Sequence, residues 1–279
     1  MVTKRKQLSR YAAGLALFFA CIGSMQLSAQ DPVPVAVTEE IELFNGKDLT
    51  NWYRFIKGRG KENDPKHVFS VVNGVLRVSG EEMGCITTEK AYRDYHLTVE
   101  YRWTGRSYGS KKKCAPDSGI LFHSIGKDGG FGDTWMLSHE YNLILGASGD
   151  FWTVGTKERP DIFLEATVGE ERLGGKYYIY SPTGKTVRLT GNDRVCRMDI
   201  ARDWADAPTV RPADNEKPLG EWNTAELICE GDRVTCLFNG KVVNRARVQP
   251  SAGKIQLQSE LCGIEFRRIT LSPLKKKLN

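Results

Sequence analysis

The chain has 279 residues, with 40 Lys or Arg against 34 Asp or Glu, for a formal net charge of +6 at pH 7. The first 29 residues hold four of these basic side chains and no acidic one, which leaves 36 basic and 34 acidic groups in the remainder. A charge so nearly balanced excludes the strongly basic surface that nucleic-acid binding requires. The length suits one large all-β domain as well as two small ones.

The first 29 residues have the parts of a secretory signal peptide. A basic segment, Lys4–Arg10, precedes an apolar run, Tyr11–Ile22, that is too short to span a bilayer. Small residues at 27–29 then offer a cleavage site. Cys21 offers a rival lipid-attachment site, although the bulky residues before it depart from the small-residue pattern expected there. We therefore expect export to the periplasm or cell surface of a bacterium, and no transmembrane segment elsewhere.

Six cysteines follow the predicted signal peptide: Cys85, Cys114, Cys196, Cys229, Cys236 and Cys262. They are scattered, without a CxxC pair or histidines at metal-binding spacing, so a zinc site is not expected. Cys229 and Cys236 flank a predicted two-residue turn, Gly231-Asp232. In that hairpin the two thiols lie diagonally across from each other, too far apart for an unstrained disulfide, so we predict free, buried thiols.

Short strands separated by Gly, Asn and Asp turns dominate the remaining chain, and helical periodicity is scarce. Asn73-Gly74 predicts a hairpin between Val68–Val72 and Val75–Val78. Tyr95–Trp103 alternates, with its apolar residues on one face. Further strands are expected at Gly119–Phe122, Tyr141–Leu145, Ala225–Cys229, Val234–Phe238, Lys254–Gln258 and Gly263–Leu271, and a further hairpin from Tyr177–Tyr180 and Thr186–Leu189. This pattern is typical of an antiparallel sandwich or barrel, and we expect one domain over residues 30–279.

Residues 117–152 concentrate the groups that carry chemistry. The ionisable members are Asp117, His123, His139, Glu140 and Asp150, and two indoles, Trp135 and Trp152, lie among them. Strands that end in such groups, joined by glycine-rich loops, are a common way to build a polar pocket on a rigid sheet. Indole faces beside carboxylates suit a sugar, whose ring stacks on the indole while its hydroxyls donate to the carboxylates. The alternative is a sheet with merely polar edges, in which Asp117 caps a turn.

Strand alternation predicts which polar groups share a face. Glu140 and Asn142 lie on one side of their strand, with apolar residues opposite. Gln256, Gln258 and Glu260 lie on one side of theirs in the same way. If both strands belong to one sheet, that sheet has an apolar face for packing and a face of amides and carboxylates. A solvated outer surface is the alternative, but amides and carboxylates in place of lysines favour a binding surface.

Six segments, in order along the chain, carry a family pattern. They are IELFNGKDLTNWY, AYRDYHLTVEYRW, DSGILFHS, EYNLILGASGDFW, GEWNTAELICEGDRVTCLFNGKVVN and GKIQLQSELCGIEFRRITLSPL, which extend over about residues 40–273. Together they resemble the family of secreted 3-keto-disaccharide hydrolases, also described as 3-keto-glucoside-1,2-lyase/hydratases. One departure is Leu261-Cys262, which stands where the family has small residues after the glutamate.

The resemblance implies a two-sheet antiparallel jelly-roll sandwich of the concanavalin A-like lectin/glucanase type. It also implies a substrate class, namely glycosides or disaccharides whose C3 hydroxyl has been oxidised to a ketone by a separate 3-dehydrogenase. The ketone makes the C2 proton acidic, so the glycosidic oxygen at C1 can leave by elimination before water adds back. Such a site needs a base near C2, an acid near the leaving oxygen and a group that holds the enolate.

Candidate residues for these roles follow from their positions in the chain. Glu140 is the first choice for base or acid, and His123 is the second because an imidazole titrates near neutral pH. Asp150 and Glu260 are candidates for a hydroxyl clamp or a metal ligand. The remaining substrate-binding candidates are Arg102, Arg106 and Lys111 for the enolate, Trp135 and Trp152 for stacking, and Asn142 and Gln258 on the polar face.

No cofactor or metal is assigned. Asp and Glu oxygens can hold a divalent cation, but their spacing here matches no known loop motif. Two other functions fit the same features. A non-catalytic carbohydrate-binding module needs only aromatic and hydrogen-bonding groups, and a conventional glycosidase needs two carboxyl groups across the pocket. The cluster of candidate acids and bases favours an enzyme over the module.

Overall fold

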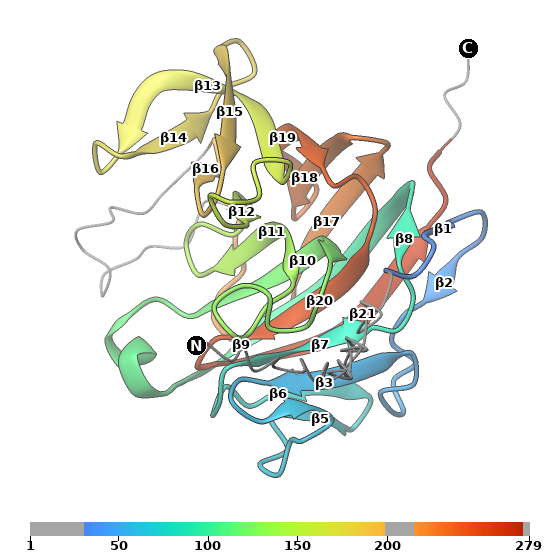
Figure 1. Cartoon of the computed structure of the whole chain (residues 1–279). Coiled ribbons are helices and arrows are strands. Elements are labelled where there is room, and N and C mark those ends of the chain that lie inside the picture. Colours follow the sequence, from blue (N-terminus) through green and yellow to red (C-terminus); the bar gives the residue numbers. More distant parts are fainter. Residues whose placement is uncertain (1–30, 199–214, 276–279) are drawn as a thin grey trace, which may run out of the picture. The chain divides into compact units, whose positions relative to one another are not determined.

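Side-chain alternation along the strands produces two layers that pack face to face in the computed structural model (Figure 1). The structure describes residues 31–198 and 215–275. The one helix within these residues is a short 3-10 helix, η1 (Gly109–Lys113). The protein is therefore all-β, as predicted.

The first layer, called the site sheet below, contains eight of the described strands. They are β3 (Trp52–Ile56), β4 (Gly60–Lys61), β7 (Gly84–Thr88), β10 (Asp117–Ile125), β11 (Leu137–Ile144), β12 (Asp150–Val154), β16 (Arg194–Cys196) and β20 (Lys254–Ser259). Their order is β4-β3-β7-β20-β10-β11-β12-β16, and all neighbours are antiparallel.

The second layer, called the back sheet, contains nine described strands. They are β5 (Phe69–Val72), β6 (Val75–Val78), β9 (Tyr95–Ser107), β13 (Phe163–Leu173), β15 (Lys185–Thr190), β17 (Asn223–Glu230), β18 (Arg233–Phe238), β19 (Lys241–Gln249) and β21 (Cys262–Ser272). Their order is β5-β6-β21-β9-β17-β18-β19-β13-β15, again antiparallel.

The remaining strands join or flank these layers. β14 (Tyr177–Tyr180) pairs with β13 and also, in parallel, with β16, so that hydrogen bonding is continuous from one layer to the other. β2 (Ile41–Glu42) pairs with the far end of β21. β1 (Val35–Ala36) and β8 (Tyr92–Arg93) form a separate two-stranded parallel sheet. The result is the predicted antiparallel jelly-roll sandwich.

The core lies between the layers and is filled by alternate residues of both. Leu97, Val99 and Tyr101 of β9 and Ile120 and Phe122 of β10 are all 0–1% exposed. Removing this much apolar surface from water is the main favourable contribution to folding. The same alternation turns the polar residues of β11 and β20 to the outer face of the site sheet, as predicted.

Two local predictions from turn chemistry are confirmed. Asn73 and Gly74 adopt φ of 52° and 79°, which is the left-handed backbone that a tight hairpin between β5 and β6 requires. In the β17-β18 hairpin Cys229 lies opposite Val234, and the Cys229 and Cys236 thiols are free and buried.

The predicted hairpin of Tyr177–Tyr180 with Thr186–Leu189 is wrong. Both segments are strands, but each pairs with β13 rather than with the other. The 11 residues of β13 are long enough to pair with β15 and then β14 in succession. At the connection, Gly184 lies so close to Val168 that a Cβ atom would be 1.9 Å from the Val168 carbonyl oxygen.

The predicted signal peptide, residues 1–29, lies outside the described residues. All described residues fall within one compact unit. No described helix has both the length and the apolar character needed to cross a membrane.

Phe122→Ala is expected to lower the free energy of unfolding by about 3–5 kcal/mol, because it leaves a cavity between the two layers. Chemical denaturation measures this loss. Val72→Ala, at a position that is 39% exposed, is the control and should change stability by roughly 0.5 kcal/mol or less. A loss at Phe122 no larger than at Val72 would contradict the assigned core.

Candidate active site

The outer face of the site sheet holds a cavity of about 300 Å³. Six of the residues predicted from the sequence line it: Trp135, Glu140, Asn142, Trp152, Gln258 and Glu260. They come from β11, β12, β20, the turn after β20, and the loop between β10 and β11. The two polar strand faces expected from alternation therefore meet in one cavity.

Gly119 in β10 allows the polar groups of the two neighbouring strands to meet. It lies directly opposite Asn142 in the β10-β11 pairing. A Cβ atom at Gly119 would be 2.4 Å from Glu140 Oε1 and 2.5 Å from Gln258 Oε1. Any larger residue would therefore push one or both of these side chains away. The missing side chain is the reason that a carboxyl group and an amide come together over β10.

Three carboxyl groups and one ammonium group form the polar end of the cavity. Asn142 Nδ2 donates to Glu140 Oε1 at 3.0 Å and to Asp117 Oδ1 at 3.1 Å. Lys111, from η1, forms an ion pair with Asp117, and its Nζ lies 3.8 Å from Glu260 Oε2. One interpretation of the sequence was that Asp117 only caps a turn, but the structure places it at the centre of this network.

Burial and crowding raise the pKa values of two of these acids. Burial raises the pKa of Glu140 to about 8, and the nearby Asp117 charge acts in the same direction. Hydrogen bonding from Asn142 and the charges of Lys111 and Arg194 partly oppose this rise. Burial, with the Asp117 charge, also raises the pKa of Glu260 well above its usual range. Glu140 can therefore both hold and release a proton near neutral pH.

Lys111 provides the counter-charge of this cluster. Burial acts to lower the pKa of its ammonium group, but the negative charges of Asp117 and Glu260 outweigh burial and raise it. The ammonium group therefore stays charged over the physiological pH range. With one fixed positive charge among three carboxyl groups, ionisation of all three at the same time is unfavourable.

Aromatic residues also line the cavity. Trp135 is 6% exposed and packs with Leu121 and Val154, with Phe131 and Trp152 against them. An apolar lining beside carboxyl groups has the two surfaces of a sugar-binding site, one for the C–H face of the ring and one for its hydroxyls. Within the described residues, the buried atoms Asn142 Oδ1, Gln258 Oε1 and Trp152 Nε1 have no hydrogen-bond partner.

Arg194 is a cavity residue that the sequence did not indicate. It lies in β16 opposite Trp152, and its Cζ is 4.8 Å from the Trp152 ring and 4.0 Å from the Tyr177 ring. Its Nη1 is 3.4 Å from Asp150 Oδ2. Because β16 has only three residues and no clear alternation, no pattern in the sequence pointed to this arginine.

Asp150 and His123 do not reach the cavity. Asp150 is fully buried, accepts a hydrogen bond from the Arg197 backbone N–H at 2.9 Å, and holds Arg194. A bulge after Phe122, with φ of 52° at His123, turns the imidazole into the core. There its ring lies edge-on to Tyr95 and Phe122, and burial lowers its pKa to about 3. His123 is thus a neutral core residue in this structure.

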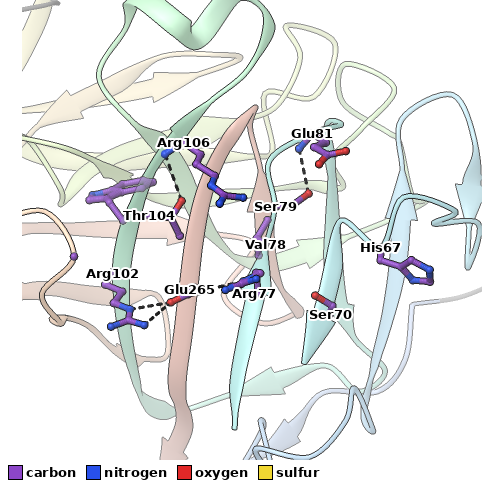
Figure 2. A pocket seen from close by; sticks show the side chains of 12 residues that line it. His67, Ser70, Arg77, Val78, Ser79, Glu81, Arg102, Thr104, Arg106 and Glu265 are labelled. Atoms are coloured by element: carbon purple, nitrogen blue, oxygen red, sulfur yellow. Dashed lines mark hydrogen bonds and ion pairs between the residues drawn. The ribbon is translucent and has the colours of Figure 1, made fainter. Parts of the chain in front are cut away.

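Arg102 and Arg106 lie on the other layer. Their strand, β9, belongs to the back sheet, and both line a separate pocket of about 500 Å³ on its outer face (Figure 2). That pocket is the larger of the two, but its one buried carboxylate, Glu265, is already ion-paired with two arginines. The smaller cavity is the better candidate active site because it gathers several acids with raised pKa values and unpartnered polar atoms. No group of three or more His, Cys, Asp or Glu among the described residues is arranged to hold a metal ion.

The pKa of Glu140 should respond to its two charged neighbours in opposite directions. Asp117→Asn removes a negative charge and should lower the pKa below 8, whereas Lys111→Met removes a positive charge and should raise it, each by about one unit. Titration of the labelled carboxyl carbon by NMR measures both shifts, with Glu140→Gln used for assignment. Shifts of the same sign in the two variants would contradict the network.

Comparison with solved structures gives matches of low sequence identity, one of which reaches a TM-score of 0.50. A putative glycosyl hydrolase from Parabacteroides distasonis matches with 17% identity and a TM-score of 0.50, over 85% of this chain and 94% of its own. A second putative glycosyl hydrolase structure from that organism matches at 17% identity and a TM-score of 0.48, over 85% and 100%. A Bacillus licheniformis β-glucanase matches at 9% identity and a TM-score of 0.43, over 85% and 99%. Identities this low bear on the fold alone.

Sequence comparison gives a more specific result. No curated protein matches the chain. The model of one family, the 3-keto-alpha-glucoside-1,2-lyase-like domain, matches residues 39–272, which is most of the chain and includes every residue of the candidate active site. The chain therefore belongs to the 3-keto-alpha-glucoside-1,2-lyase-like domain family.

Proposed function

We propose that this protein is an exported enzyme that cleaves 3-keto-glycosides by elimination and rehydration, with net hydrolysis of the glycosidic bond. The observation that carries the proposal is Glu140, a buried carboxyl group whose pKa is raised to about 8 and which lines a cavity of about 300 Å³ together with aromatic residues. Membership of a family named for 3-keto-glucoside lyases supports the substrate class.

The reaction starts with proton transfer between C2 of the substrate and Glu140. The ionised Glu140 carboxylate takes the C2 proton, whose acidity comes from the ketone at C3, and an enolate forms. The enolate then expels the oxygen at C1, the C1–O bond breaks, and protonated Glu260 donates its proton to the leaving oxygen. The products of this half are an enone and the free alcohol.

Rehydration restores both acids. Water adds its oxygen to C1 of the enone and passes a proton to the Glu260 carboxylate, while Glu140 returns its proton to C2. Each acid thus ends in the state in which it began, and one water molecule is consumed. The pKa of about 8 lets Glu140 take and return a proton near neutral pH, and the raised pKa of Glu260 favours the protonated form that it needs as the acid.

Arg194 is the cation best placed to hold the enolate oxygen. It lines the cavity, and its charge already acts on Glu140. Two aromatic rings and Asp150 hold its guanidinium in place, so little reorganisation is needed when negative charge develops. This role replaces the one that the sequence suggested for Arg102 and Arg106.

The chemistry also defines a partner reaction. An unoxidised glycoside has no acidic C2 proton, so a separate dehydrogenase that oxidises the C3 hydroxyl has to supply the substrate. The proposal therefore includes two further points, that the protein is exported and that its substrate must first be oxidised at C3.

Glu140→Gln should abolish release of the alcohol from a 3-keto-glucoside, because the amide cannot accept the C2 proton. The measurement is product formation by chromatography, with Glu170→Gln as the control, since Glu170 is an exposed glutamate of β13. For the unaltered protein, deuterium at C2 should slow turnover.

Other outcomes of this experiment would identify the rival functions. Saccharide binding without any product over days would indicate a carbohydrate-binding module. Hydrolysis of an unoxidised glycoside without an isotope effect at C2 would indicate a conventional glycosidase. Unchanged turnover in Glu140→Gln would remove Glu140 from its assigned role.

Gly119→Ala should lower kcat/KM by about 10²-fold with little loss of stability, because the added methyl group displaces the ends of flexible side chains rather than backbone. Steady-state kinetics and thermal unfolding measure the two effects. Gly169→Ala in β13 is the matched control, since its nearest neighbour would be 3.7 Å away. Equal activity in the two variants would contradict the geometry assigned to Glu140 and Gln258.

A further inference from the structure

The larger pocket, of about 500 Å³, lies on the outer face of the back sheet and has no part in the proposed reaction (Figure 2). Its floor is formed by β6, β21 and β9, which lie side by side. Because Leu97, Val99, Tyr101 and Trp103 of β9 face the core, the alternate residues Arg102, Thr104 and Arg106 face outward into this pocket.

A row of three charged residues crosses the floor. Glu265 of β21 lies opposite Arg77 of β6 on one side and Arg102 of β9 on the other. Its carboxylate accepts from Arg77 Nε at 3.2 Å and from Arg102 Nη2 at 2.7 Å. Glu265 is 6% exposed, whereas the two arginine side chains are 50% and 38% exposed. One buried carboxylate therefore fixes two guanidinium groups that still face the pocket.

In the next row, the missing side chain of Gly263 in β21 leaves room for the Thr104 hydroxyl. A Cβ atom at Gly263 would be 2.2 Å from Thr104 Oγ1 and 3.5 Å from Arg106 Cβ. Arg106 is exposed beside Thr104 and Gly263, and its guanidinium forms no ion pair with any described residue. The lining thus has three arginines against two glutamates, Glu265 and the exposed Glu81.

The hydroxyl groups in this pocket are oriented as donors. Thr104 Oγ1 accepts from the Arg106 backbone N–H at 3.4 Å, and Ser79 Oγ accepts from the Glu81 backbone N–H at 3.3 Å, as the dashed lines in Figure 2 show. Neither hydroxyl donates to a described protein acceptor, so its proton is available to a ligand. Three guanidinium groups and two hydroxyl groups that line one pocket favour a ligand rich in hydrogen-bond acceptors.

We propose that this pocket is a second binding site, separate from the cavity of Glu140, for an anionic saccharide. The carboxylate or sulfate group of the sugar pairs with the guanidinium groups of Arg106 and Arg102 above Gly263, because planar guanidinium groups match such oxyanions with two parallel hydrogen bonds. The sugar hydroxyls accept from Ser79 and Thr104. This pocket binds the ligand but does not catalyse a reaction on it, because its only buried acid, Glu265, is ion-paired.

Isothermal titration with glucuronate tests the proposal on the full-length protein at low salt. Glucuronate binding that depends on Arg106 is expected, with weaker binding of inorganic sulfate, whereas binding of methyl glucoside in the Glu140 cavity should not depend on Arg106. Added salt should weaken the affinity, because both charges face solvent. Arg106→Ala should lower the affinity at least tenfold while turnover of a 3-keto-glucoside stays unchanged. Glu140→Gln should leave glucuronate binding intact, which separates this site from the proposed reaction.

Arg233→Ala is the matched control, because it removes the charge of an exposed arginine in β18, away from the pocket lining. The proposal is overturned if Arg106→Ala and Arg233→Ala weaken glucuronate binding equally, or if Arg106→Ala weakens methyl glucoside binding as much as glucuronate binding. Sulfate that binds as tightly as glucuronate overturns the saccharide part. Gly263→Ala, whose methyl group would displace the Thr104 hydroxyl, should also weaken binding, and unchanged binding in that variant would remove Thr104 from the site.

Discussion

The ion pair between Lys111 and Asp117 is the interaction on which the candidate active site depends. Three carboxyl groups meet in a mostly buried place, where like charges repel strongly and ionisation is costly. One ammonium group compensates for one of them, which leaves Glu140 and Glu260 with raised pKa values. Arg194 adds a second positive charge that acts on Glu140, but burial outweighs both cations and keeps the pKa of Glu140 raised.

The fold supplies the geometry that this electrostatic arrangement needs. Adjacent antiparallel strands place Leu121 opposite both Glu140 and Gln256, so their outward side chains form rows across the sheet. A row of full-sized side chains would keep the acids apart. Gly119 lies in the adjacent row, opposite Asn142, and the Glu140 and Gln258 side chains close over it because it has no side chain. A rigid sheet holds these groups in place at little further entropic cost, which is an advantage over a site built on loops.

The same two chain segments build both pockets. β9 carries Arg102 and Arg106 on the back sheet and continues into η1, where Lys111 reaches the acids of the site sheet. β20 carries Gln258 in the site sheet, and the chain then passes Glu260 and enters β21, where Glu265 holds the arginines of the other pocket. Because the segments pass from one layer to the other, residues that are close in sequence serve opposite faces of the sandwich.

Local alternation and turn chemistry predict the all-β fold and most strand positions, and they place Glu140 with Asn142 and Gln258 with Glu260 on polar faces. The layer that each strand joins depends instead on pairing between distant parts of the chain. In the folded protein, Arg102 and Arg106 lie on the back sheet, away from the acids, and Arg194 lies in the cavity with them. A bulge sent His123 into the core against the alternation of its strand, and the long β13 separated two strands expected to pair. Such outcomes depend on contacts between distant segments, which a local pattern does not encode.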